Sequence, residues 1–122
     1  MLIIYQALST FTQDEFGDVV TQTQYIGGTP TSPNKLRLHF TDNSFLDIWL
    51  SADEDYSYHW ERRGQTGEIY RWDNAPHHSY INTFPDHLHQ GDEKSVVESD
   101  LNSTPQLALH TILLFVRDKL LA

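Results

Sequence analysis

Residues 35–51, KLRLHFTDNSFLDIWLS, decide the fold, because apolar and polar residues alternate in two runs joined by a short polar link. A period of two is typical of β-strands that bury one face. We expect a β-hairpin whose loop has three residues, Asp42, Asn43 and Ser44. The expected apolar pairs are Phe40 with Leu46, Leu38 with Ile48, and Leu36 with Leu50. All of these side chains would then share one face of the hairpin.

The opposite face of this hairpin follows from the same register. Arg37 is expected across from Trp49, and His39 across from Asp47, as ordinary cross-strand contacts. A two-residue loop would instead place Leu38 opposite Asp47 and break the apolar face. The three-residue loop is therefore the predicted one.

The remaining elements complete an α+β fold, an antiparallel β-meander of about five strands with an N-terminal helix and a C-terminal helix packed on one face. Residues 2–16 fit a helix, although their threonines and isoleucines also allow a strand. Further strands are expected at 18–26, 56–61 and 68–73, with a short edge strand at 95–97. The last helix is expected at about 104–121, with Thr104 as its N-cap and Pro105 at its first position.

The length and charge of the chain limit the classes of function. Its 122 residues predict one domain, 1–122, with a single core. Eight Lys and Arg against 17 Asp and Glu give a net charge of −9, which argues against binding nucleic acid through the whole surface. Three of the eight cations, Arg62, Arg63 and Arg71, fall within ten residues of sequence. A local basic site therefore remains open.

The absence of cysteine excludes disulfides, thiolate catalysis and thiolate zinc sites, and it fits a cytoplasmic protein. The N-terminus has neither a basic region nor a cleavage pattern typical of a secretory signal. No segment approaches the roughly 20 apolar residues of a membrane span. We expect no contact with membranes.

The candidate functional residues gather in the segment 70–89, YRWDNAPHHSYINTFPDHLH, which holds four of the seven histidines. Imidazole is the side chain whose ordinary pKa lies closest to neutral pH, so clustered histidines are typical of acid–base and metal chemistry. Strand alternation places Arg71 and Asp73 on one face, just before His77 and His78. After Trp72 the chain is expected to leave the sheet, because Pro76 and Pro85 suit loops.

Several interpretations of this segment stay open. In a structural one, Asp73 caps the turn through its carboxylate and the histidines hold a long loop. In a metal one, an extended chain puts His87 and His89 on one side, and His77 with Asp73 or Asp86 completes the ligands. The spacing matches none of the strong zinc patterns. A serine hydrolase is disfavoured, because the sequence has no G-x-S-x-G elbow.

The segment also contains what metal-independent phosphodiester cleavage requires: a base, an acid, and a cation for the charge that develops on phosphate. Two histidines with Arg71 satisfy these needs, and Asp73 can orient one imidazole. Aromatic side chains for stacking on a base are Tyr70, Trp72 and Tyr80.

The motif YRWDNAPHH, followed by TFPDHLH and a glycine, resembles the signature of the TumE-like toxin family of small prokaryotic proteins. The hairpin turn TDNS and the strand YSYHW also match, and the resemblance spans about residues 18–98. This sequence departs from the family pattern at three positions. Asn43 replaces the usual turn glycine, and Asp86 and Leu88 replace a histidine and a lysine. The lost basic residue weakens the expectation of polyanion binding.

The resemblance implies the toxin of a toxin–antitoxin module, with a helix-turn-helix antitoxin as partner and RNA as the natural target. Combined with the histidine chemistry, it predicts a nuclease that needs no cofactor or metal. Its expected site residues are His77 and His78 for acid–base transfer, Arg71 for phosphate, Asp73 as orienter, and His87 and His89 from the opposite side. The alternative is a non-enzymatic protein-binding module, or a metal-binding protein, with a structural His-rich loop. The oligomeric state stays open, a homodimer included.

Overall fold

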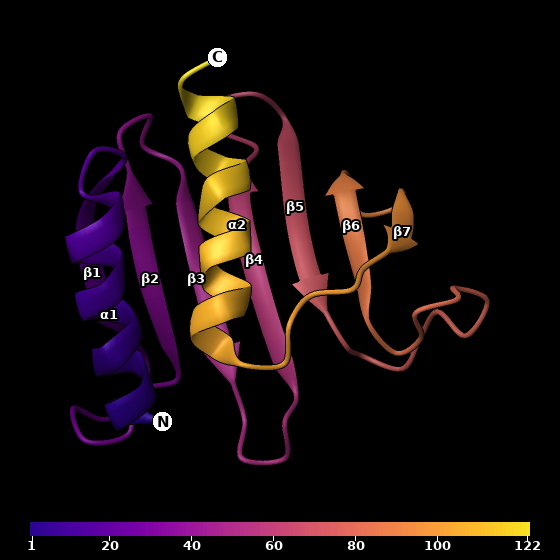
Figure 1. The fold of residues 1–122 in the computed structure, drawn as a ribbon, viewed down its shortest axis with the longest axis horizontal. Helices are drawn as coiled ribbons and strands as arrows, with labels where there is room; N and C mark the ends of the chain where they lie inside the picture. Colours follow the sequence, from indigo (N-terminus) through magenta and orange to yellow (C-terminus); the bar gives the residue numbers. More distant parts are fainter.

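The computed structural model describes all residues 1–122 and contains two helices and one seven-stranded sheet. The strands follow each other through the sheet in chain order, each antiparallel to the next, as in a meander (Figure 1). The elements are α1 (Leu2–Phe16), β1 (Val20–Ile26), β2 (Lys35–Phe40), β3 (Phe45–Leu50), β4 (Tyr56–Arg62), β5 (Glu68–Asp73), β6 (His87–Gly91), β7 (Val96–Glu98) and α2 (Pro105–Leu120).

Both helices lie on one face of the sheet and leave the other face open (Figure 1). The predicted α+β class, the meander and the two helices are confirmed, with seven strands in place of about five. The unpredicted strand is β6, which returns alongside β5 after the loop that contains Pro76 and Pro85. Thr104 occupies the N-cap position of α2 as expected, but its side chain makes no capping hydrogen bond. Neither helix is long and apolar enough to cross a membrane.

The predicted register of the first hairpin is wrong by two residues, although the predicted apolar face is right. Leu38 pairs with Leu46 and Leu36 with Ile48, because the loop begins one residue earlier than expected. The Phe40 N–H donates to the Ser44 carbonyl over 2.9 Å, so Ser44 belongs to the strand pair. The loop keeps three residues, 41–43, and Asn43, with a φ of 69°, is its left-handed residue.

This register places Arg37 opposite Asp47, where Trp49 had been expected. The guanidinium donates Nε to Asp47 Oδ1 over 2.7 Å and an Nη to Oδ2 over 2.9 Å. Such a two-point ion pair fixes relative orientation as well as charge. The pair lies on the open face of the sheet, which therefore carries ordered polar side chains.

The core lies between the sheet and the two helices. Alternate residues of the strands point into it and meet the apolar faces of α1 and α2. The bulkiest contributors are Tyr5, Phe16, Phe40, Trp60, Tyr70, Trp72 and Leu109. Tyr70 and Trp72 are therefore unavailable for stacking on a base, contrary to the sequence-based expectation. Arg71 and Asp73, their neighbours on β5, point to the open face.

Candidate active site

The candidate site forms where β5 and β6 pair on the open face of the sheet. Asp73 is the cross-strand partner of His87, and Arg71 is the partner of His89. Because side chains two apart on a strand share a face, all four project to the same side. Leu88, between the two histidines, packs against the core on the other side. This alternation places both histidines on the same face as Asp73.

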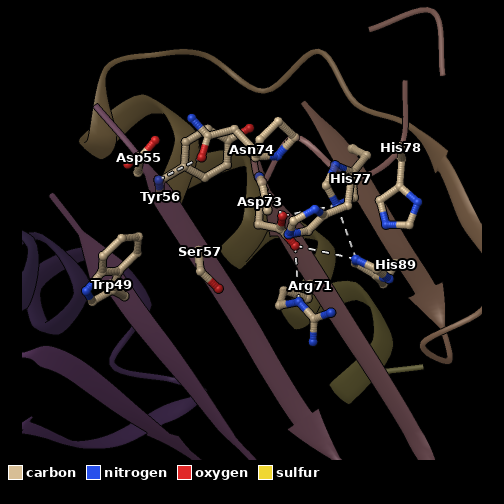
Figure 2. A pocket seen from close by; sticks show the side chains of 13 residues that line it. Trp49, Asp55, Tyr56, Ser57, Arg71, Asp73, Asn74, His77, His78 and His89 are labelled. Carbon is tan, nitrogen blue, oxygen red and sulfur yellow. Dashed lines mark hydrogen bonds and ion pairs between the residues drawn. The ribbon is translucent and has the colours of Figure 1, made fainter. Parts of the chain in front are cut away.

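The Asp73 carboxylate is the centre of the cluster. Its Oδ1 lies 3.0 Å from His87 Nε2, and its Oδ2 lies 3.5 Å from His89 Nε2 and 3.1 Å from Arg71 Nε. Figure 2 shows Arg71 and His89 directed toward this carboxylate. Oδ1 also accepts the N–H of Ala75 over 2.9 Å, so the predicted turn cap exists as well. The structural interpretation and a chemical one therefore apply to the same side chain.

The hydrogen bonds of His87 and His89 fix where their protons sit. His87 Nδ1 lies 2.9 Å from the Pro85 carbonyl, and His89 Nδ1 lies 2.9 Å from the Glu93 carbonyl. A carbonyl oxygen only accepts, so each Nδ1 carries a hydrogen. The two Nε2 atoms face each other over 3.2 Å, next to Asp73. The two Nε2 atoms and the carboxylate thus converge on one point, where a proton or a metal cation between them offsets the repulsion of their lone pairs.

His78 adds a third imidazole from the loop between β5 and β6. Its ring centroid lies 4.6 Å from that of His87 and 5.5 Å from that of His89. His87 and His89 are 1% and 5% exposed, whereas His78 is only partly buried. Desolvation, followed by the neighbouring His87 and His89, holds the pKa of His78 below its ordinary value. His78 is therefore the member of the cluster that a solute reaches.

Arg71 is held by carboxylates on two sides. Its two Nη atoms donate to the Glu93 carboxylate over 2.9 and 2.7 Å, and its Nε donates to Asp73. The ion pair with Glu93, and then that with Asp73, raise the pKa of Arg71 above its usual range. The Glu93 carboxylate occupies the outer edge of the guanidinium, and its side chain is 51% exposed. An anion arriving from solvent would have to replace it.

A pocket of about 440 Å³ opens over this cluster. Its lining includes Arg71, Asp73, His77, His78, His87 and His89, which are all six of the residues expected from the sequence. His77 is exposed at the rim and is not within ligand distance of the other three histidines. Trp49, on β3, lines the opposite side of the same pocket with 38% of its surface exposed. Figure 2 shows it across the open face from Arg71.

Arg62 and Arg63, which lie close to Arg71 in the sequence, do not join the site. Arg62 lies over the ring of Trp60 near Asp42 and Glu68, and Arg63 pairs with Glu61. The local basic site left open by the sequence is therefore absent, because acidic partners neutralise each arginine separately. Sequence reasoning missed Glu93 and Trp49. Nothing in the local sequence indicates that Glu93 belongs to the site. Trp49 was expected opposite Arg37 because of the error in register.

Comparison with models of known protein families finds a match to this chain. The family model described as Toxin TumE matches residues 9–120. No curated protein and no solved structure matches the chain. The match covers nearly the whole chain and extends past the expected segment into α2, so the C-terminal helix falls within the family region. This chain belongs to the TumE toxin family, the toxins of toxin–antitoxin modules, and membership implies an antitoxin partner.

Proposed function

We propose that this toxin cleaves RNA at the histidine pocket, with its own side chains as acid and base. The observation that carries the proposal is the convergence of His87 and His89 on Asp73, with His78 beside both rings, in a pocket open to solvent. Structural histidines of a loop would each need only one carbonyl partner. Here two rings already have such partners through Nδ1 and still direct Nε2 toward a shared point.

In the proposed reaction His78 takes the proton from a ribose 2′-hydroxyl, and that oxygen attacks the adjacent phosphorus. The bond from phosphorus to the 5′-oxygen breaks, and His77 at the rim gives the leaving oxygen a proton. The products are a 2′,3′-cyclic phosphate and a free 5′-hydroxyl. The rings of His87 and His89 pack against His78 and orient it, and Asp73 contacts both of those rings.

Arg71 supplies the cation for the phosphate. A phosphate oxygen pair matches the geometry that the Glu93 carboxylate now occupies on the two Nη atoms. Binding of RNA would therefore exchange one bidentate anion for another. Trp49 offers an exposed ring on the far side of the pocket, at the place where a nucleobase can stack.

The partner in this proposal is a helix-turn-helix antitoxin, and the site of action is cytoplasmic RNA. A second candidate function follows from the same contacts around Arg71. Glu93 and Asp73 already accept hydrogen bonds from the guanidinium of Arg71. The cluster can therefore serve as a rigid surface that binds a protein and catalyses no reaction. The two functions differ in what purified protein does to RNA.

The test uses untagged, purified protein with single-stranded and structured RNA in the presence of a chelator. Wild type should leave fragments that end in 2′,3′-cyclic phosphate. His78→Ala should abolish cleavage without changing the melting temperature. His39→Ala is the matched control, because His39 lies in the same sheet but does not line the pocket. Intact RNA with and without divalent metal would reject the proposal.

A further inference from the structure

We propose that His78, His87 and His89 form a transition-metal site, with Zn²⁺ as the ion that fits it best. This inference goes beyond the proposed RNA chemistry, and the binding itself does not depend on it. The ligand atoms of the three rings lie within 4.8 Å of one another. Imidazole nitrogen is a ligand that zinc, copper and nickel prefer, whereas magnesium and calcium prefer oxygen.

The spacing of the two buried rings is the first support. In a tetrahedral site with Zn–N bonds of 2.0–2.1 Å, neighbouring ligand atoms are about 3.3 Å apart. His87 Nε2 and His89 Nε2 are 3.2 Å apart, and their distances to the Asp73 oxygens are 3.0 and 3.5 Å. The two histidine nitrogens therefore already have the separation of neighbouring ligands in a tetrahedral site.

The second support is the orientation of the rings. A histidine that binds metal through one nitrogen usually donates its other N–H to a carbonyl or carboxylate, which fixes the tautomer. His87 and His89 both do this, to the carbonyls of Pro85 and Glu93. Their Nε2 lone pairs are thereby presented toward the same point. A hydrogen-bonded pair of histidines would need this outer arrangement on one ring only.

The third support is charge and access. Asp73 supplies a negative charge beside the two buried rings, and it is itself held by Arg71 and the Ala75 N–H. His78 closes the site from a loop that faces the open pocket, which gives an ion a path from solvent. A fourth coordination position then faces the pocket, as in zinc sites with three protein ligands and a water.

Bound Zn²⁺ would occupy the imidazole of His78, which is the base of the proposed cleavage. Zinc is therefore expected to inhibit RNA cleavage, and removal of zinc to restore it. This consequence rests on the proposed function, whereas the stoichiometry and affinity of zinc binding do not. The two claims can fail separately.

The experiment is calorimetric titration of Zn²⁺ into chelator-treated, untagged full-length protein, with Co²⁺ absorption as a second readout. One equivalent should bind, and Co²⁺ should give the visible spectrum of a tetrahedral site. His78→Ala should weaken Zn²⁺ binding by at least about a hundredfold. His77→Ala is the matched control, since His77 is adjacent in sequence but lies outside the cluster, and it should bind as wild type. Mg²⁺ should not bind there.

Zinc bound equally well by wild type and by His78→Ala, or bound below one equivalent, would overturn the metal site. Zinc bound with full stoichiometry, with RNA intact under all conditions, would support the metal site and reject the nuclease. Cleavage that requires zinc would support the site and reject metal-independent chemistry. Cleavage without any zinc binding would reject the site alone.

Discussion

Asp73 Oδ1 lies 3.0 Å from His87 Nε2 across two adjacent strands, and this contact joins the sheet to the candidate site. Asp73 is 6% exposed, and its carboxylate also contacts Arg71 and His89. Removing one partner of a buried charged cluster leaves the others uncompensated, at a cost of about 3–5 kcal/mol. Asp73→Ala should therefore lower the free energy of unfolding by that amount, as measured by urea denaturation. A loss below about 1 kcal/mol would show that the cluster is not held together by Asp73.

Glu93 should limit access of anions to Arg71, because its carboxylate occupies both Nη atoms. Glu93→Gln removes that charge and should strengthen binding of a short RNA several-fold at low salt, with a steeper salt dependence. Fluorescence anisotropy at several salt concentrations measures both the affinity for RNA and its salt dependence. Glu98→Gln makes the same charge change on β7 without contact to Arg71, so it should bind RNA more weakly than Glu93→Gln. Equal affinities of the two variants would contradict the role given to Glu93.

Much of the fold follows from alternation in the sequence, which indicates the paired strands and the buried face of each. The register of β2 and β3 does not follow from alternation, because a shift of two residues leaves the same side chains in the core. The conformation of Asn43 and the Arg37–Asp47 ion pair favour the observed register. These depend on backbone angles and on polar contacts, which a pattern of apolar residues leaves undetermined.

The candidate site was predicted as a set of residues, but not as an arrangement. His87-Leu88-His89 alternates like a strand, yet the five residues between Pro85 and Gly91 are too few to distinguish a strand from a loop by pattern. Pairing with β5 is what makes them β6 and brings His87 to Asp73. The partnership of Arg71 with Glu93 joins residues 22 apart in sequence, and no local motif encodes it.

The turn at Asn43 provides a test of the observed register. Asn43 has a φ of 69°, which glycine adopts freely and most other residues adopt at a cost of roughly 1–2 kcal/mol. Asn43→Ala should therefore destabilise the protein by about 1 kcal/mol, and Asn43→Gly should cost little. Chemical denaturation of the two variants compares them directly. Equal stability of both would indicate a different turn and hence a different register.

The pH dependence of stability should depend in part on Glu61. Hydrogen bonds from the Arg63 side chain lower the pKa of Glu61 from 4.5 to about 2. A carboxylate with a lowered pKa stabilises the fold above its ordinary pKa and loses that effect as the pH falls toward the folded value. Glu61→Gln should melt below wild type at pH 7, and the difference should shrink as the pH falls from 4.5 to about 2. A difference that stays constant over this range would contradict the assignment.

The most direct measurement of the central claim is growth of a bacterial host after induced expression of wild type, His78→Ala and His39→Ala, with soluble protein verified for each. If the histidine pocket carries the toxic activity, wild type and His39→Ala should arrest growth, and His78→Ala should not. Arrest by soluble His78→Ala as strong as that by wild type would contradict the claim and place the toxic surface elsewhere on the protein.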